Sequence, residues 1–329
     1  MPDFSTIRWG IIGPGSIAKS FCRGVAVLDD HKVVAVGSRT REKANAFADE
    51  FDVPNRHASY QALVEDPEVD AVYVSTPHPY HKENGLQALN AGKPVLCEKP
   101  FTINERELRD VVDLARAKKL FLMEAMWTRF FPIMYRVREL VAEGAIGEVR
   151  MVQADFGFRA GFDPQSRLFD PALGGGALLD VGIYVCSLSS MVLGAPDRIT
   201  GLATIGETGV DEQAAVVLGH PSGAVSMLFS AVRTNTPHVA VINGSEGRIT
   251  IHSPFWKPEK LTLERKGEGD EVIELPMTGS GFNYEIEEVG RCLRAGKTES
   301  DVMPLDESLS LMRTMDELRR QWGVKYPTE

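Results

Sequence analysis

Cysteine is scarce in this sequence, and its placement excludes a disulfide-rich secreted protein. The 329 residues include four cysteines, which lie far apart and form no C-x-x-C pair: Cys22, Cys97, Cys186 and Cys292. Small secreted scaffolds use closely spaced cysteines, whereas isolated cysteines in apolar contexts are typical of reduced thiols in a core. We therefore expect a protein from a reducing compartment.

Long apolar runs and an excess of positive charge are also missing. No window approaches the roughly eighteen apolar residues that a membrane helix requires, and the opening MPDFSTIRWG has no basic region followed by an apolar stretch. The formal net charge of -10 offers no electrostatic footprint for nucleic acid or an anionic membrane. We expect a cytoplasmic protein that binds small molecules, with no nucleic-acid or membrane partner.

The composition that remains is that of an ordinary globular protein with two domains. Hydrophobic residues make up 43% and charged residues 25% of the chain, and its 329 residues exceed what one core usually serves. From residue 6 to about 126, helix-like segments such as 41–51 and 103–118 alternate with short apolar runs: TIRWGII, KVVAVGS, DAVYVST, PVLCEKP and LFLMEA. Such nearly continuous runs predict strands covered on both faces, hence a parallel Rossmann-type α/β sheet. Thr102 followed by Glu105 is a capping-box pattern that predicts the start of the second helix.

The alternation of helix-like segments and short apolar runs ends after residue 126. A helix-like stretch at about 131–143, a strand-like VRMVQADFGF and a Gly-rich loop with another helix precede a long β-rich section between about 197 and 276. Its runs are separated by turn signals without helices, which predicts antiparallel pairing. Closing helices are expected near 283–295 and 305–322. We therefore divide the chain into an α/β domain, residues 1–126, and an α+β domain with a mostly antiparallel sheet, residues 127–329.

The segment WGIIGPGSIAKSF carries a G-x-G-x-x-A pattern between a predicted strand and a predicted helix. Gly13 permits a tight turn, Gly15 lets backbone N–H groups approach a pyrophosphate, and Ala18 lets helix and strand pack closely. We expect Ser16 and Ile17 to complete a dinucleotide site at the positive end of the helix. The alternative is a Gly-rich turn that serves packing alone.

The end of the second predicted strand indicates which dinucleotide binds. A carboxylate at this place accepts hydrogen bonds from the ribose 2′-hydroxyl of NAD, but the sequence reads VGSRTREK. Ser38 and Arg39 offer donors and a cation that suit a 2′-phosphate, so we predict NADP as the cofactor. Arg41 or Lys43 could share the role of Arg39, and the alternative is that Arg39 is a solvated loop residue.

The loop STPHPYHKE follows a predicted strand at the carboxyl edge of the sheet, where ligands of such folds bind. We expect Thr76 and Pro77 to form a wall beside the cofactor, with His81 starting the next helix. His78 and His81 could instead be imagined as metal ligands. Zinc sites need three or four ligands, and the sequence offers no acidic or cysteine partner nearby, so no metal is predicted.

The stretch PVLCEKPF places two charges at the carboxyl end of a buried strand, on the sheet edge that carries the Gly-rich turn. Glu98 and Lys99 should therefore reach the cofactor cleft. Hydride transfer from an alcohol carbon to a nicotinamide requires the hydroxyl proton to leave, and Lys99 beside that oxygen can lower the barrier. We also expect a cis Lys99–Pro100 bond, because X-Pro bonds tolerate that isomer. The alternative is a surface turn with an incidental ion pair.

The run GGGALLDVGIYV is a second candidate site. Glycines 174–176 allow close backbone approach, and the following helix places Asp180 and Tyr184 at i and i+4 on one face. A lysine cation can lower the pKa of a tyrosine, so we expect Lys99 from one domain and Tyr184 from the other to form an acid–base pair. The alternative is a capped helix with a tyrosine buried in an interface.

Four ordered motifs, GPGSIA, CEKP, EAMWTRFFP and GGGALLDVGIY, together resemble the glucose-fructose oxidoreductase, inositol dehydrogenase and MocA superfamily. The resemblance covers essentially the whole chain. Within the superfamily the sequence is most similar to the group of dimeric dihydrodiol dehydrogenases and NADP-dependent D-xylose dehydrogenases. Many members have histidine where Tyr184 stands, and the tyrosine is typical of the dihydrodiol and glucose-fructose branch.

This resemblance implies a Rossmann domain followed by a large, mostly antiparallel open sheet that binds substrate and forms a dimer. It implies that Lys99 and Tyr184 act on the substrate hydroxyl with Asp180 nearby, and that Trp127 and Arg129 line the cofactor pocket. The expected activity is an NADP(H)-dependent dehydrogenase that acts on a CH–OH group of a cyclic polyol such as xylose, or on a trans-dihydrodiol.

Other interpretations stay open. The same residues could reduce a keto- or anhydroketo-sugar with NADPH. A non-catalytic NADP(H) sensor could use the β-rich half to recruit a partner, although retention of both Lys99 and Tyr184 counts against it. Apolar residues on runs such as AVSMLFSAV predict a homodimer through the C-terminal sheet, unless they cover the sheet's own helices.

Overall fold

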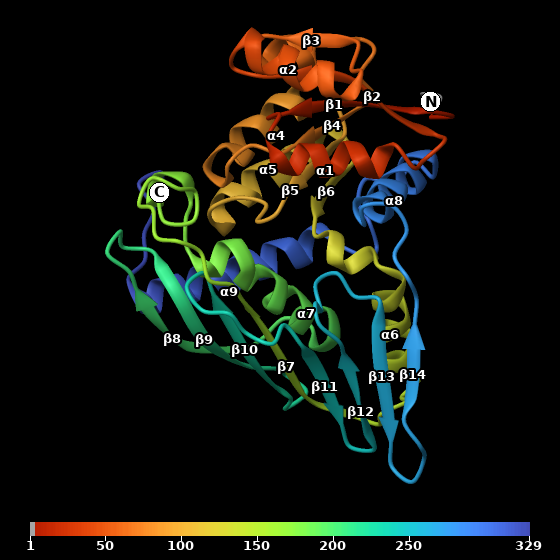
Figure 1. The fold of residues 1–329 in the computed structure, drawn as a ribbon, viewed down its shortest axis with the longest axis vertical. Coiled ribbons are helices and arrows are strands. Elements are labelled where there is room, and N and C mark those ends of the chain that lie inside the picture. Colours follow the sequence, from red (N-terminus) through yellow and green to blue (C-terminus); the bar gives the residue numbers. More distant parts are fainter. Residues whose placement is uncertain (1–3) are drawn as a thin grey trace. The chain divides into compact units, whose positions relative to one another are not determined.

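The computed structural model describes residues 4–329, and these residues form two compact units (Figure 1). The first unit contains the chain up to Thr102, Arg106–Trp127 and Thr278–Ser308. The second contains Ile103–Glu105, Thr128–Met277 and Leu309–Glu329. A single division at residue 126 does not describe these units, because the chain returns to the first one near its C-terminal end.

The first unit is built on a parallel sheet with the strand order β3-β2-β1-β4-β5-β6. Its strands are β1 (Ile7–Ile12), β2 (His31–Gly37), β3 (Asn55–His57), β4 (Ala71–Val74), β5 (Val95–Glu98) and β6 (Leu122–Ala125). Its helices are α1 (Ser16–Val25), α2 (Arg41–Phe51), α3 (Tyr60–Val64), η1 (His78–Tyr80), α4 (His81–Asn90), α5 (Glu105–Lys118) and α8 (Phe282–Arg294). This is the predicted Rossmann-type sheet, whose order reverses between β1 and β4, where such folds bind ligands.

Apolar runs of the sequence form the centre of this sheet. Every residue of β4, β5 and β6 is buried, as expected for strands covered on both faces. The sequence did not predict β3, because its three residues are Asn, Arg and His and carry no hydrophobic periodicity. The short helix α3, which follows β3, was missed as well.

The capping-box prediction at Thr102 was wrong. Helix α5 begins at Glu105 rather than directly after Thr102, which is fully buried. The backbone N–H of Glu105 donates to the Asp316 carboxylate at 2.8 Å. A residue distant in sequence therefore caps this helix, which a local motif does not reveal.

Helix α8 packs against α1 and so belongs to the first unit. Gly24 on α1 allows the approach, because a Cβ there would lie 2.9 Å from the backbone nitrogen of Asn283. His31 at the start of β2 also lies against α8, since a Cβ on Gly290 would lie 2.6 Å from its Nε2. The Trp9 indole N–H donates to Nδ1 of the same ring at 3.0 Å. Chain order suggested the second domain for this helix, and its contacts correct that expectation.

The cysteines are free and buried, as expected of core thiols. Burial raises the pKa of the Cys22 thiol to about 12 and that of Cys186 to about 12. Both thiols are therefore protonated near neutral pH, the state in which cysteine is a poor nucleophile.

The second unit is built on an open sheet with the strand order β14-β13-β12-β11-β7-β10-β9-β8. Its strands are β7 (Val149–Gly157), β8 (Arg198–Ile205), β9 (Asp211–Gly219), β10 (Val225–Ala231), β11 (Ala240–Gly244), β12 (Gly247–Ile251), β13 (Lys260–Arg265) and β14 (Glu271–Glu274). The pairs are antiparallel apart from β7 and β10, which run parallel. The predicted large, mostly antiparallel sheet is confirmed, and the parallel pair was not foreseen.

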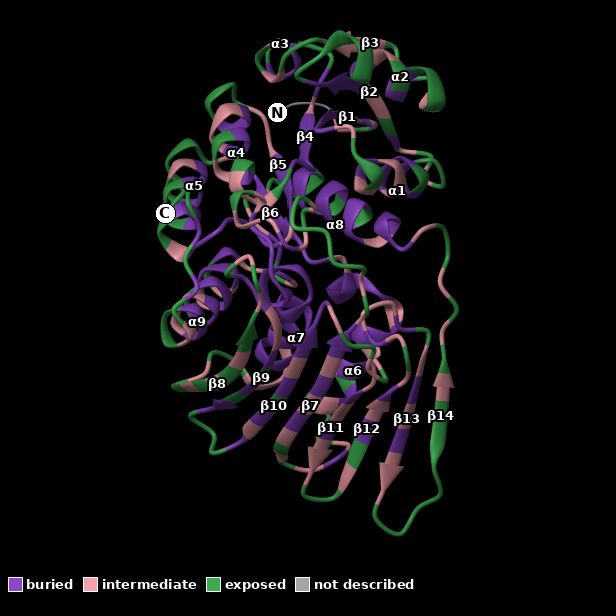
Figure 2. Ribbon diagram, turned by 60° about the vertical axis from the view of Figure 1, so that its left-hand side comes forward, coloured by how far each residue is buried: buried purple, intermediate pink, exposed green. Residues whose placement is uncertain are grey.

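The helical elements that accompany this sheet include one unusually apolar stretch. They are η2 (Trp127–Phe130), α6 (Pro132–Ala142), η3 (Pro171–Leu173), the π-helical η4 (Leu178–Gly182), α7 (Ile183–Leu193) and α9 (Leu305–Trp322). Pro171–Leu193 contains a window with a mean hydropathy of 1.7, enough by length and composition to cross a membrane, and 83% of that window is buried inside the protein. This is more apolar than the sequence led us to expect. Its helix α7 packs on β7 and β10 and is largely buried (Figure 2).

Candidate active site

The turn after β1 has a backbone geometry that favours glycine. Gly13 has a φ of +93°, and a Cβ on it would lie 2.9 Å from the Cγ2 of Thr76. The Ser75 hydroxyl lies 2.9 Å from the carbonyl oxygen of Gly13 and 3.1 Å from that of Ile12. Ser75, which the sequence did not single out, therefore fixes the turn from the end of the neighbouring strand β4.

No side chain of the N-cap residue caps the N-terminus of helix α1. Gly15 is the N-cap residue and supplies no side-chain hydrogen bond, and a Cβ on it would meet no protein atom within 4 Å. Open space thus lies at the helix start formed by Ser16 and Ile17, where the helix dipole favours an anion. Ala18 is fully buried, as close packing requires. These positions fit the pyrophosphate of a dinucleotide.

A cavity of about 470 Å³ lies in the first unit. It is lined by Arg39, Ala58, Ser59, Tyr60, Gln61, Thr76, Pro77, Tyr80, Glu83, Asn84 and Gln87. Asn84 fixes one wall, because its side-chain amide donates to the Thr76 hydroxyl at 2.9 Å. The cavity thus brings together Arg39, Thr76 and Pro77 from separate predicted loops. It has room for the adenosine end of a dinucleotide.

The basic residues Arg39 and Arg41, which follow β2, have different surroundings in the structure. Arg39 is exposed at the cavity, whereas the neighbouring Ser38 is buried. Arg41 donates from its guanidinium to the backbone carbonyl of Arg56 at 2.7 Å, away from the cavity lining. Tyr60 was missed because α3 was missed, and burial raises the pKa of its hydroxyl, with Arg39 acting in the opposite direction.

His81 joins the loops that follow β4 and β5. Its ring nitrogens lie 2.9 Å from the carbonyl oxygen of Pro100 and 2.6 Å from that of Thr76, and the residue is 1% exposed. Burial lowers the pKa of this imidazole. His81 therefore connects the loop after β4 to the loop after β5. Within residues 4–329 no group of three or more His, Cys, Asp and Glu side chains could hold a metal ion.

Strand β5 delivers Glu98 and Lys99 to the carboxyl edge of the parallel sheet, and the Lys99–Pro100 bond is cis as predicted. Glu98 is 7% exposed. Its Oε1 accepts a hydrogen bond from the Tyr73 hydroxyl at 2.5 Å, and its Oε2 accepts one from the backbone N–H of Lys99 at 3.3 Å. Glu98 is thus a buried, hydrogen-bonded carboxyl group, which does not suit the alternative of a surface turn.

Glu285 on α8 is a second buried carboxyl that the sequence did not point to. It is fully buried, and neither of its oxygens has a hydrogen-bond partner among residues 4–329. Burial first, and then the charge of Glu98, raises the pKa of Glu285 well above its usual value. Its protonation at neutral pH avoids two neighbouring negative charges at the strand end that leads to Lys99.

The motif MWTRFFP divides between the two units. In the first, Trp127 stacks on Phe282, with ring centroids 4.8 Å apart and planes at 23°. In the second, Arg129 is 2% exposed and donates to the Ser187 hydroxyl at 2.9 Å and to the Ser187 carbonyl oxygen at 2.7 Å. The guanidinium of Arg129 is therefore hydrogen-bonded to α7.

The helix that follows glycines 174–176 begins as the π-helix η4 and continues as α7. Asp180 in η4 is 5% exposed and Tyr184 in α7 is 7% exposed. The Arg167 guanidinium donates to Asp180 Oδ1 at 2.6 Å. The sequence predicts plain α-helical spacing here, and no local pattern announces the π segment. Such segments occur frequently at functional sites.

A cluster of aromatic rings in the second unit contacts Tyr184 through Phe156. Phe156 on β7 lies 5.3 Å from the Tyr184 ring, and Trp256 stacks on Phe156 at 3.6 Å with planes 7° apart. His238 lies 4.5 Å from the Trp256 ring and is fixed by its Nε2, which lies 2.5 Å from the carbonyl oxygen of Gly157. These residues come from separate strands and loops, so sequence spacing does not connect them. Phe156 is thus the aromatic neighbour of Tyr184, and Trp256 packs against Phe156.

Two family profiles match this chain. The profile described as "Oxidoreductase family, NAD-binding Rossmann fold" matches residues 7–126, and the profile "GFO/IDH/MocA C-terminal domain" matches residues 134–250. The chain belongs to the GFO/IDH/MocA oxidoreductase family. The resemblance carried by the four sequence motifs is therefore confirmed, and residues 7–126 have the NAD-binding Rossmann fold of this family.

Curated members of the family are similar over almost the whole chain. The mouse trans-1,2-dihydrobenzene-1,2-diol dehydrogenase is 39% identical over 335 residues, which covers 98% of this chain and 99% of the mouse protein. The human protein of the same name is 38% identical, with the same coverage. The chain is accordingly an oxidoreductase of the dehydrogenase type.

Two solved structures are similar to this chain over almost its whole length. KijD10, a 3-ketoreductase from Actinomadura kijaniata in complex with NADP and TDP-benzene, has a TM-score of 0.86 at 28% identity and covers 96% of this chain and 97% of its own. Aldose-aldose oxidoreductase from Caulobacter crescentus has a TM-score of 0.88 at 24% identity, over 97% of this chain and 98% of its own. The second likeness shows a shared fold.

Proposed function

We propose that the protein is an NADP(H)-dependent dehydrogenase that moves a hydride between the nicotinamide and a carbinol of a cyclic polyol, either an aldose such as xylose or a trans-dihydrodiol. Lys99 and Tyr184 would handle the proton. The observation that carries this proposal is the place of Lys99, directly after β5 at the sheet edge where the Gly13 turn begins α1. The names of the similar dehydrogenases and ketoreductase support the substrate class.

The preference for NADP over NAD rests on the lining of the cavity. Arg39 is exposed there, and no Asp or Glu stands in the segment Ser38 to Thr40 to accept bonds from a free ribose hydroxyl. A guanidinium forms charge-assisted hydrogen bonds with a phosphate, whereas NAD offers it none at this place. KijD10, a relative at 28% identity, was solved with NADP.

Replacing Arg39 with alanine should raise the Kd for NADP+ by about 10²-fold and leave that for NAD+ within about threefold, because the charge-assisted hydrogen bonds of the guanidinium to the 2′-phosphate are lost. Arg41→Ala is the matched control, since Arg41 is held by the carbonyl of Arg56. Fluorescence titration of each variant with both dinucleotides measures the effect. Equal losses for the two dinucleotides, or a larger loss with Arg41→Ala, would contradict the assignment of Arg39.

In this proposal, each residue of the site has its own role in the transfer of the hydride and the proton. The nicotinamide, when bound, supplies the hydride chemistry. Lys99, as an ammonium group, would stabilise the negative charge that develops on the substrate oxygen, and Tyr184 would exchange the proton of that oxygen. Asp180, held by Arg167, would orient the substrate or Tyr184 by hydrogen bonding. The rings of Phe156 and Trp256 would cover the apolar face of a sugar or diene ring.

Two alternative functions are tested against this proposal. Reduction of a keto-sugar with NADPH uses the same residues in the reverse direction, and the name of KijD10 favours it. A non-catalytic NADP(H) sensor would need the cavity to bind the cofactor. It would not need side chains that transfer a proton. Incubation of the purified protein with NADP+ or NADPH and a panel of aldoses, polyols, dihydrodiols and keto-sugars, followed at 340 nm, tests all three. Cofactor binding without turnover of any candidate would favour the sensor. 

The outer surface of the large sheet supports a homodimer. Leu202 on β8 is 82% exposed, Met227 on β10 is 49% exposed and Val217 on β9 is 43% exposed. Met227 pairs directly with Val217, so these side chains lie on one face, while the alternating Val216 and Leu228 are 3% exposed. An apolar patch of this kind on a folded sheet is typical of an interface.

Light scattering of the purified protein should therefore give about twice the chain mass of 36.2 kDa. The double variant Leu202→Glu and Met227→Glu should give monomers, because like charges would face each other across the interface. Glutamate on the exposed strand β14, as in Val272→Glu, is the matched control, and we expect it to remain dimeric. A monomeric wild type would reject this interface.

A further inference from the structure

We propose that residues 324–329, here called the C-terminal strap, hold the glycine turn before η4 and thereby position Asp180 and Tyr184. The inference rests on the proposed role of these two residues in substrate chemistry. It makes Tyr326 and its anchors positioning residues, which act on the reaction through the backbone of the turn. All residues in this argument belong to the second unit.

The strap contacts the turn through one buried phenol. The Tyr326 hydroxyl donates to the backbone carbonyl oxygen of Gly175 at 2.7 Å, and Tyr326 is 3% exposed. Gly176 has a φ of +119°, and a Cβ on it would collide with Asp211 Oδ1 and lie 3.4 Å from the Tyr326 oxygen. The turn therefore passes between the strap and strand β9, with no room for a larger residue.

Asp211 holds the other side of the turn. Its Oδ2 accepts a hydrogen bond from the backbone N–H of Leu178, the first residue of η4, at 2.7 Å. Asp180, two residues further, receives the bond from Arg167 described above. A shift of the turn would thus move the start of η4 and, through the continuous helix, Tyr184.

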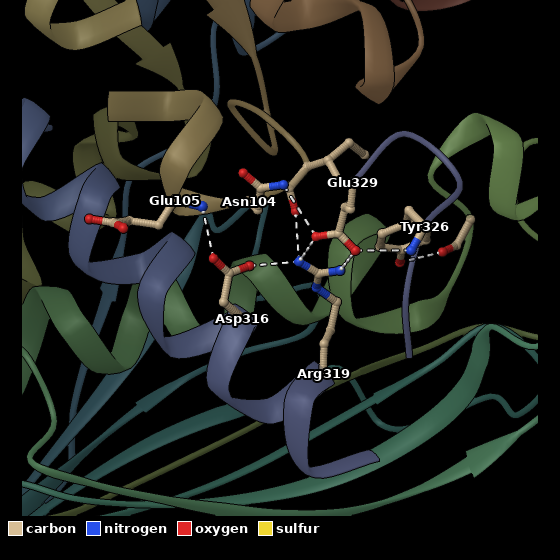
Figure 3. Close-up of polar contacts among 8 residues, drawn as sticks. Asn104, Glu105, Asp316, Arg319, Tyr326 and Glu329 are labelled. Carbon is tan, nitrogen blue, oxygen red and sulfur yellow. Dashed lines mark hydrogen bonds and ion pairs between the residues drawn. The ribbon is translucent and has the colours of Figure 1, made fainter. Parts of the chain in front are cut away.

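Arg319 anchors the strap to α9 (Figure 3). Its guanidinium makes a bidentate contact with Glu329 at 2.8 and 2.9 Å, and it also donates to Asp316 at 2.7 Å. Glu329 in turn accepts a bond from the Tyr326 backbone N–H at 2.9 Å, and the Arg319 guanidinium lies 4.9 Å from the centre of the Tyr326 ring. Arg319 is 3% exposed. Bidentate pairs of this kind fix geometry as well as charge.

The ionisation states of Tyr326 and Glu329 favour the hydrogen bonds that hold the strap. Burial raises the pKa of Tyr326 well above its usual value, so its hydroxyl remains a donor. Burial acts against ionisation of Glu329, but the hydrogen bonds from Arg319 outweigh it and lower the pKa of that carboxyl. Glu329 is therefore a carboxylate at neutral pH, as the pair with Arg319 requires.

Hydrogen exchange and kinetics of Tyr326→Phe and Glu329→Gln test the strap. Each variant should increase amide exchange of residues 174–184 by about tenfold, the effect of losing roughly one hydrogen bond, and leave β9 and β10 unchanged. The kcat should fall about tenfold with KM for NADP+ within about twofold, since the dinucleotide site lies in the first unit. Glu317→Gln is the matched control, because Glu317 pairs with the exposed Arg320 on the same helix, and it should match wild type.

Each outcome of these experiments either supports the proposed role of the strap or overturns it. Unchanged exchange at 174–184, or an increase spread over the whole sheet, would overturn the strap as a local device. A local increase with unchanged kcat would overturn its positioning role. If the wild type turns over no tested substrate, the proposed function fails, while the exchange data still decide whether the strap holds the turn.

Discussion

Replacing Lys99 with methionine is expected to lower kcat by about 10³-fold or more while NADP+ still binds within about threefold of wild type. Methionine keeps much of the length of the side chain and removes the ammonium group. We propose that the dinucleotide is held elsewhere, by the turn at Gly13 and by the cavity that Arg39 lines. Loss of charge at the end of β5 should therefore affect the chemical step rather than cofactor affinity. Stopped-flow and steady-state assays at saturating substrate measure it.

Lys82→Met is the control for this prediction, because Lys82 lies on the surface of α4 and pairs with Asp110. It should retain wild-type kcat and cofactor binding. If Lys99→Met loses NADP+ binding, Lys99 chiefly holds the nucleotide. If it retains most of the turnover, the proposed chemistry is wrong.

Replacing Tyr184 with phenylalanine is expected to lower kcat by about 10²-fold, because the variant keeps the ring and loses the hydroxyl that we propose exchanges the proton. The contact with Phe156 is made by the ring, so folding should be preserved. Tyr135→Phe, which removes a hydroxyl from the exposed face of α6, is the matched control and should behave as wild type.

The double variant Lys99→Met with Tyr184→Phe separates a shared role from two independent ones. If both groups act on the same oxygen, the double variant should lose little more than Lys99→Met alone, since effects within one catalytic unit are not additive. Fully multiplied losses would mean that the two residues serve different steps.

Several features of the first unit could be predicted from the sequence because each depends on residues that are neighbours in the chain. Continuous apolar runs predicted the strands, the G-x-G-x-x-A spacing predicted the turn at Gly13, and the proline after Lys99 predicted a cis bond. The elements that failed had no such signal. Strand β3 is short and polar, and helix α5 is capped by the distant Asp316 rather than by Thr102.

Residues brought together by tertiary packing could not be predicted. Glu285 lies on a helix that returns to the first unit late in the chain, and its high pKa follows from burial near Glu98. The rings of Phe156 and Trp256 come from a strand and a loop with no shared periodicity. The hydrogen bonds of Arg129 to Ser187 on α7 likewise join residues far apart in the sequence. The cytoplasmic location remains a prediction from the sequence.

A crystal structure of the protein with NADP+ and an unreactive analogue of its polyol substrate tests the central claim most directly. We predict that Lys99 Nζ and Tyr184 Oη both lie within about 3.5 Å of one analogue hydroxyl, whose carbon faces the nicotinamide, as a near-attack arrangement requires. A complex in which either side chain points away from that hydroxyl, or in which the dinucleotide does not occupy the turn at Gly13, would contradict the account.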